Sequence, residues 1–147
     1  MQKEKTALFI GHSQIPADLE AAVTAEIVRL IQDGAATFLN GGMGGFDMLC
    51  ARCVNRVKAA YPHVRHCIVI PYLAPERYRT DLFDESLYPG LENVPPRAAI
   101  VRRNQWMVEN ASHAICYVNH GFGGAAATLR YAVKKGLSVV NLGSYKG

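Results

Sequence analysis

The sequence lacks the features that mark membrane, exported and repetitive proteins. No apolar run approaches the roughly 18 residues of a membrane span, and residues 1–6 are too polar to begin a signal peptide. There is also no low-complexity tract, heptad series or internal repeat, which excludes coiled-coil and solenoid architectures. We therefore expect a cytoplasmic protein with no membrane partner.

Cysteine is scarce, with four residues in 147. In a chain without an export signal, these are expected to be free thiols rather than disulfides. Cys50 and Cys53 form a C-x-x-C, but a zinc site needs two more ligands at suitable spacing, and Cys67 and Cys116 stand alone in apolar runs. We therefore expect small buried thiols, with no metal and no redox site.

Acidic side chains are missing from the end of the chain, because none follows Glu109. Residues 1–92 carry nine basic and eleven acidic side chains, whereas residues 93–147 carry seven basic and one acidic. The net charge of +4 therefore arises entirely in the last third of the chain. Such a local excess indicates either a region that meets an anion or a solvated basic face.

The composition itself, 50% hydrophobic and 19% charged, is typical of a globular domain that buries its own core. Short apolar or β-branched runs alternate with amphipathic stretches, which indicates a parallel sheet flanked by helices. Strands are predicted over residues 6–10, 36–39, 66–70, 113–118 and 137–142. Helices are predicted over residues 16–32, 46–60, 103–110 and 123–135. Residues 71–96 lack periodicity, which predicts an irregular excursion with a short helix near residues 84–87.

This alternation predicts one domain over residues 1–147, a Rossmann-like three-layer α/β/α sandwich with a mainly parallel sheet of about five strands. Such sheets bind ligands outside the carboxyl ends of their strands, and eight of the 13 glycines follow predicted strands. They are Gly11, Gly41, Gly42, Gly44, Gly45, Gly121, Gly123 and Gly124. Tight turning accounts for about one glycine per turn, so the excess indicates backbone N–H groups that approach an anion at helix N-termini.

The glycine clusters do not fit two common nucleotide motifs. A P-loop requires G-x-x-x-x-G-K-[ST], and no lysine follows either cluster. The GFGGAA run at residues 121–126 approaches the dinucleotide fingerprint, but its acidic partner about 20 residues later is absent. We therefore expect neither a P-loop triphosphatase nor a dinucleotide oxidoreductase, and no cofactor.

Four motifs appear in one order along nearly the whole chain: FIGH (residues 9–12), NGGMGGFD (40–47), RNQWMV (103–108) and GGAAAT (123–128). Together they resemble the YpsA-like branch of the SLOG superfamily, a Rossmann-like group that includes DprA and Lonely Guy proteins. The resemblance implies a domain that binds a nucleotide or nucleoside-phosphate derivative, as a sensor or carrier. It also implies that the two glycine-rich loops hold the phosphate.

The candidate ligand-binding residues come from all four motifs. Arg103 and Asn104, expected at the start of a helix, offer a bidentate phosphate grip and an amide that reads a base or ribose. Asp47 is expected to cap its helix or contact ribose, and His12 to bond either ligand or backbone. The full set is Gly11, His12, Ser13, Gly41, Gly42, Gly44, Gly45, Asp47, Arg103, Asn104, Gly123, Gly124 and Thr128.

Two other functions stay open. Lonely Guy phosphoribohydrolases carry P-G-G-x-G-T-x-x-E, whereas this chain has Arg130 or Tyr131 in place of the glutamate. A carboxylate stabilises the cationic ribosyl centre and an arginine opposes it, which argues against that activity and leaves no assigned catalytic residue. A hydrolase or transferase using Asp47 or an acid from residues 76–92 is the alternative.

The third function is single-stranded nucleic-acid binding, by analogy with DprA. The charge excess is modest, and the aromatic residues of the last third do not alternate with basic ones as a stacking groove would require. We therefore expect a small-molecule nucleotide rather than nucleic acid as the partner. Related domains often form dimers, so a homodimer is an alternative to a monomer for this protein.

Overall fold

Six parallel strands form one sheet, in the order β4-β3-β2-β1-β5-β6. The computed structural model describes residues 1–147, apart from the side chain of Pro75. The strands are β1 (Thr6–Gly11), β2 (Thr37–Asn40), β3 (Arg65–Val69), β4 (Glu85–Leu87), β5 (His113–Tyr117) and β6 (Ser138–Asn141). The predicted α/β class with a parallel sheet is confirmed.

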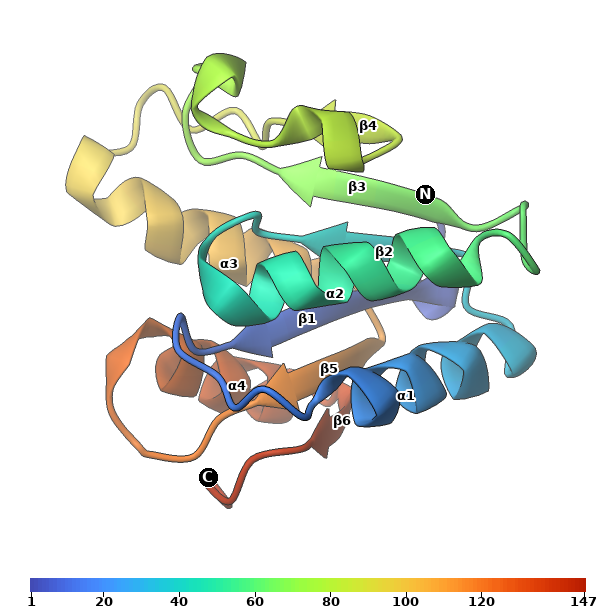
Figure 1. Ribbon diagram of the computed structural model, residues 1–147. Coiled ribbons are helices and arrows are strands. Elements are labelled where there is room, and N and C mark those ends of the chain that lie inside the picture. Colours follow the sequence, from blue (N-terminus) through green and yellow to red (C-terminus); the bar gives the residue numbers. More distant parts are fainter.

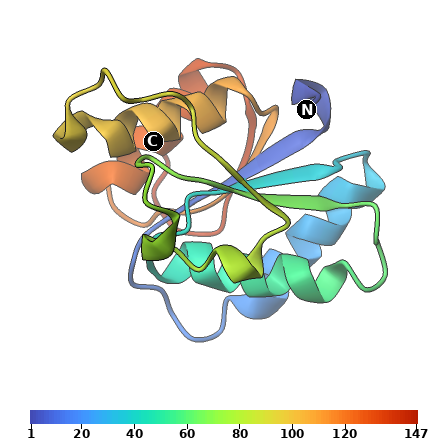
Figure 2. The same ribbon diagram turned by 90° about the horizontal axis from the view of Figure 1, so that it is seen from above.

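Two pairs of helices cover the two faces of the sheet (Figure 1). Helices α1 (Glu20–Gln32) and α2 (Gly44–Val57) pack together on one face, and α3 (Ala99–Glu109) and α4 (Gly123–Lys134) pack together on the other. The view from above shows the sheet between these layers (Figure 2). The result is the predicted three-layer sandwich.

Strand β1 lies in the middle of the sheet and supplies both cores. Ala7 and Phe9 belong to the apolar cluster under α1 and α2, whereas Leu8 and Ile10 belong to the cluster under α3 and α4. Alternate residues of a strand point to opposite faces, and both faces are covered here. The continuous apolar run at the start of the chain therefore follows from its central position.

The strand order reverses at β1. After β1 the chain builds β2, β3 and β4 on one side, and then returns to place β5 and β6 on the other. The loops that leave the carboxyl ends of β1 and β5 diverge to opposite faces of the sheet. In open α/β sheets this reversal is where ligands bind.

Two expectations for residues 71–110 are wrong. Residues 85–87 form strand β4, paired with β3, instead of a short helix, so the sheet has six strands. Asp84 anchors this strand, because its Oδ2 accepts a hydrogen bond from the His66 N–H at 2.7 Å and its Oδ1 pairs with Lys58. Helix α3 begins at Ala99, after a 3₁₀ turn over Pro96–Ala98, four residues earlier than predicted.

His66 on β3 is a buried polar side chain inside the sheet core. Its ring packs against Phe83, with ring centroids 4.5 Å apart, and it is 0% exposed. Within the described residues, neither ring nitrogen has a hydrogen-bond partner. Burial lowers the pKa of His66 to about 4, so the ring is neutral at pH 7.

The four cysteines are free and buried, as predicted. Burial raises the pKa of Cys67 and of Cys116 to about 12, so both remain protonated thiols. Among the described residues, no three His, Cys, Asp or Glu side chains gather into a metal-binding group. None of the described helices has the length and apolar character needed to cross a membrane.

Candidate functional site

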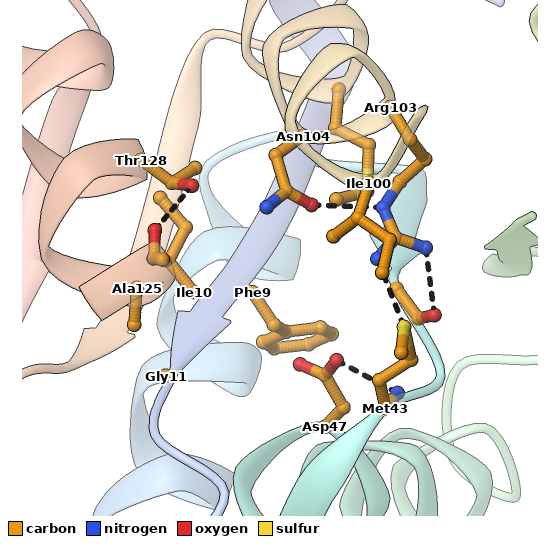
Figure 3. Close-up of a pocket in the computed structure, with 13 residues that line it drawn as sticks. Phe9, Ile10, Gly11, Met43, Asp47, Ile100, Arg103, Asn104, Ala125 and Thr128 are labelled. Atoms are coloured by element: carbon orange, nitrogen blue, oxygen red, sulfur yellow. Dashed lines mark hydrogen bonds between the residues drawn. The ribbon is translucent and has the colours of Figure 1, made fainter. Parts of the chain in front are cut away.

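A cavity of about 160 Å³ lies at the carboxyl end of β1, at the reversal of strand order. It is bounded by β1, by the loop between β2 and α2, by the first turn of α2, and by α3 and α4 (Figure 3). The lining residues are Phe9, Ile10, Gly11, Gly41, Met43, Asp47, Ile100, Arg103, Asn104, Met107, Gly124, Ala125 and Thr128.

The size of the cavity limits what it holds. Ligand pockets commonly measure about 300–1,000 Å³. Water occupies about 30 Å³ in the liquid, so about five water molecules match the volume of this cavity. It therefore fits one phosphate group or part of a sugar, and the remainder of a larger ligand would lie outside it.

Four backbone N–H groups in and just after the first glycine loop, residues 41–45, donate to acceptors of the chain itself. The pairs are Gly42 with Asn40 Oδ1 (2.7 Å), Met43 with Asp47 Oδ2 (3.0 Å), Gly45 with Ser13 O (2.8 Å) and Phe46 with His12 O (3.3 Å). These groups are therefore not free to bind an anion.

Close packing explains the glycines of this loop. A Cβ at Gly44 would lie 2.9 Å from the Cα of Ser13, and a Cβ at Gly45 would overlap the carbonyl oxygen of Ser13. The loop after β1 thus lies directly against the start of α2. The glycine cluster at residues 41–45 is therefore explained by contact between two loops rather than by anion binding.

The second glycine loop, residues 121–124, differs in this respect. Gly123 has φ +89°, a conformation that favours glycine. Gly124 has no such φ, and apart from its chain neighbours and the adjoining backbone of α4 no described atom lies within 4 Å of the position of a Cβ. Neither the backbone nor packing therefore accounts for glycine at position 124.

Helix α4 presents free backbone donors to the cavity. The first N–H groups of a helix have no intrahelical acceptors, and the side chain of the N-cap residue Phe122 caps none of them. Gly124 and Ala125 line the cavity, and Thr128 Oγ1 donates to the Gly124 carbonyl at 2.8 Å. The helix dipole adds positive potential at this end.

Arg103 forms one wall of the cavity and is only 2% exposed. Its Nη1 donates to the carbonyl of Val69 at 2.7 Å and to that of Gly41 at 2.9 Å. Its Nε donates to Asn104 Oδ1 at 2.8 Å (Figure 3). The guanidinium thus ties the ends of β2 and β3 to α3. Arg103 lies in the second turn of α3 rather than at its start, and most of its donors are already used.

Asn104 and Asp47 present polar atoms to the cavity. Because Asn104 Oδ1 accepts from Arg103, its amide nitrogen is the end turned toward the open space (Figure 3). Asp47 accepts from the Met43 N–H through Oδ2 (Figure 3). Burial raises the pKa of Asp47 to about 7, although the Met43 N–H and the Arg103 charge both lower it.

His12, His120 and Phe122 form an aromatic stack in the loops that lead from the cavity residue Gly11 and toward the cavity residue Gly124. The ring centroids of His12 and His120 are 3.9 Å apart, and those of His120 and Phe122 are 3.8 Å apart. His12 follows β1, whereas the other two rings follow β5. Burial and the neighbouring His120 lower the pKa of His12, which favours a neutral ring.

The structure places about half of the predicted ligand residues around the cavity. Those in its lining are Gly11, Gly41, Asp47, Arg103, Asn104, Gly124 and Thr128. Those outside its lining are His12, Ser13, Gly42, Gly44, Gly45 and Gly123. His12 and Ser13 instead border a second hollow with Gln14, Asn119 and His120.

Sequence reasoning missed the apolar part of the lining and the aromatic stack. The missed lining residues are Phe9, Ile10, Met43, Ile100, Met107 and Ala125. They resemble ordinary core residues in sequence. Of the stack, His12 was predicted as a ligand residue, whereas His120 and Phe122 were not, because the H-G-F run before Gly123 has no pattern that distinguishes it from an ordinary loop.

The residues that replace the Lonely Guy glutamate do not line the cavity. Arg130 Nη1 donates to Gly121 O at 2.9 Å and to the Tyr145 hydroxyl at 3.0 Å. Tyr131 donates its hydroxyl proton to Glu109 at 2.5 Å. Neither side chain supplies a carboxylate to the cavity.

Together, the fold and the cavity define a Rossmann-like α/β domain with a small polar cavity at the end of its central strand.

No protein-family model matches the sequence, and a search of characterised proteins finds no match either. Solved structures do match it in fold. DNA processing protein A (DprA) from Streptococcus pneumoniae superposes with a TM-score of 0.66, at 14% identity and over 95% of this chain.

DprA from Helicobacter pylori, described for its single-stranded DNA binding mode, superposes with a TM-score of 0.69, at 14% identity and over 95% of this chain. The match covers 50% of the Streptococcus chain and 65% of the Helicobacter chain. The protein therefore has a DprA-like Rossmann-type fold. This comparison also contradicts the expectation that set nucleic acid aside as a partner, because a protein of the same fold is described for binding single-stranded DNA.

Proposed function

We propose that the protein binds a nucleoside phosphate, as a sensor or carrier, with the phosphate on the N–H groups of Gly124 and Ala125 at the first turn of α4. The observation that carries this proposal is Gly124, a glycine that faces the cavity and that neither backbone conformation nor packing explains. Free helix donors, the helix dipole and close backbone approach are the physical requirements of a phosphate site.

The other polar residues of the cavity take supporting parts in this proposal. The Asn104 amide nitrogen donates to the phosphate or sugar, while Arg103 holds the cavity wall from behind. The volume of about 160 Å³ suits one phosphate. We assign the chain to a single YpsA-like SLOG-type domain over residues 1–147, with the second glycine loop as its phosphate loop.

Replacing Gly124 with alanine tests the proposal directly. We expect Gly124→Ala to weaken binding of adenosine 5′-monophosphate and ribose 5-phosphate by at least about tenfold, because the methyl group blocks charge-assisted hydrogen bonds. The same change leaves the free energy of unfolding unchanged or raises it by up to about 1 kcal/mol, since alanine favours helix. Calorimetric titration and urea unfolding measure the two quantities.

The control is Gly45→Ala, which adds the same methyl group in the first glycine loop. That methyl meets the Ser13 carbonyl, so the free energy of unfolding falls by about 1–3 kcal/mol. Wild-type affinity for both ligands in Gly124→Ala would contradict the proposal. So would a wild-type protein that binds neither ligand saturably.

Single-stranded DNA is a second candidate, supported by the fold shared with Helicobacter pylori DprA. Each unit of a strand also joins a base, a sugar and a phosphate, although the phosphate is a diester and the sugar is deoxyribose, and the cavity holds only one such phosphate. We expect a labelled oligothymidylate to compete with adenosine 5′-monophosphate for the α4 site and to dissociate steeply as salt rises, because several phosphates release counterions. Anisotropy titrations at two salt concentrations measure this, and binding without competition would place DNA elsewhere.

A further inference from the structure

The aromatic stack runs from the protein surface to the core. Phe122 is its outermost ring and is 71% exposed. At its inner end, His12 meets the edge of Tyr117, with centroids 6.2 Å apart and an interplanar angle of 89°. Tyr117 in turn lies 6.4 Å from Phe46, which is fully buried. The exposed ring is therefore supported from behind by a continuous series of aromatic side chains.

Hydrogen bonds fix the two histidines of the stack. The backbone N–H of Asn119 donates to His12 ring Nε2 at 3.1 Å, and the backbone N–H of His12 donates to the backbone carbonyl of Tyr117 at 3.2 Å. His120 Nδ1 donates to the Phe122 carbonyl at 3.1 Å. The rings are thus held in a parallel arrangement before any ligand arrives, which reduces the entropy lost on binding.

The exposed face of Phe122 adds little to the stability of the chain. Burying a phenylalanine side chain contributes about 1.5–3 kcal/mol, and most of that contribution is absent here. A flat apolar face that is rigidly held and open to solvent is the form in which proteins stack nucleobases.

The position of Phe122 relates the stack to the phosphate site. Phe122 is the N-cap residue of α4 and directly precedes Gly123 and Gly124. A nucleoside phosphate consists of a flat base and a charged phosphate joined through a sugar, so it needs one binding site for each part. Neighbouring sites for both parts lie at the reversal of strand order, with His12 supplied after β1 and Phe122 after β5.

We propose that Phe122, backed by His120 and His12, is the stacking platform for the nucleobase of the ligand whose phosphate lies at α4. This inference rests on the proposed function for the phosphate half of the ligand. Stacking uses the π-face that every base has, so the platform accepts all bases and favours the larger purines. A free nucleotide and one unit of a single strand offer the same chemistry.

The experiment compares wild type and Phe122→Leu against adenosine 5′-monophosphate and ribose 5-phosphate, which lacks the base. Wild type is expected to bind the nucleotide about tenfold or more tightly than the sugar phosphate, because stacking of one base contributes about 1–3 kcal/mol. Phe122→Leu loses this preference and binds ribose 5-phosphate as wild type does. Phe122→Trp, which retains a flat ring, keeps the preference.

A second measurement separates this inference from the phosphate proposal. Adenosine, which has a base but no phosphate, should shift the ring-proton NMR signals of His12 and His120 in wild type and not in Phe122→Leu. If these shifts appear while ribose 5-phosphate fails to bind, the platform stands and the phosphate site does not. If Phe122→Leu retains the preference for the nucleotide, the base lies elsewhere and the inference is overturned.

The source of the base is settled by the same variant. With a free nucleotide as the natural ligand, adenosine 5′-monophosphate binds at least as tightly as an oligodeoxyadenylate strand. With a strand as the ligand, the oligonucleotide binds more tightly, and Phe122→Leu weakens it by the same factor as the mononucleotide. Loss of affinity for neither ligand in Phe122→Leu counts against the platform in both cases.

Discussion

Replacing Arg103 with methionine is expected to lower the free energy of unfolding by about 3–5 kcal/mol. The side chain is 2% exposed, and its Nη1 is a hydrogen-bond donor to both Gly41 O and Val69 O. Methionine fills much of the space but leaves these two carbonyls unpaired and removes the positive charge near Asp47. Each orphaned buried acceptor costs about 1–3 kcal/mol, and two such acceptors account for the expected loss.

Urea unfolding measures this effect, and Arg102→Met is the matched control. Arg102 is the exposed neighbour on the same helix, so its replacement should change the free energy of unfolding by less than about 0.5 kcal/mol. An Arg103→Met protein with wild-type stability but no affinity for ribose 5-phosphate would contradict the structural role. That outcome would instead support the direct contact between Arg103 and phosphate that the sequence predicted.

Two buried groups are expected to give the stability of this protein opposite pH dependences. The folded-state pKa of Asp47 is raised from 3.8 to about 7, so its contribution is fully present below pH 3.8 and is lost as pH rises toward 7. The folded-state pKa of His66 is lowered from 6.5 to about 4, so its contribution is present above pH 6.5 and is lost as pH falls toward 4. The contribution of Asp47 to the free energy of unfolding changes by about 4 kcal/mol over its pH range and that of His66 by about 3 kcal/mol, in opposite directions.

Single substitutions separate the two slopes. In Asp47→Asn only His66 remains, so the free energy of unfolding should rise between pH 4 and 6.5 more steeply than in wild type. In His66→Phe only Asp47 remains, so it should fall across the same range relative to wild type. Urea titrations at half-unit steps of pH measure both curves. Two variants with parallel curves would show that these groups do not titrate as their burial implies.

The sequence predicted the fold well where hydrophobic periodicity and local chemistry agree. The continuous apolar run of β1 and the amphipathic pattern of α1 appear in the structure within a few residues of their predicted bounds. Strand β4 was missed because three residues carry no measurable period, and because pairing with β3 and the Asp84 anchor are non-local. The early start of α3 depends on the turn at Pro96, which periodicity does not show.

The candidate site was predictable only in outline. Both glycine loops look like phosphate loops in sequence, yet the first is filled by contacts with Ser13, a residue about 30 positions earlier in the chain. Arg103 resembles a ligand contact until its acceptors, the carbonyls of Gly41 and Val69, are known. The stack of His12 on His120 joins two distant segments, so no local pattern shows it.

The pairing of β1 with β5 has a consequence for how the protein acquires function during synthesis. Ala7 pairs with His113, so the central strand keeps one edge open until most of the chain has left the ribosome. Contacts of such long sequence separation form slowly, because loop closure precedes the gain from pairing. His12 emerges early, but it meets His120 only after β5 has docked. Under the proposed function, a nucleotide would therefore stabilise only the chain in which β5 has docked, and would not assist its first half to fold.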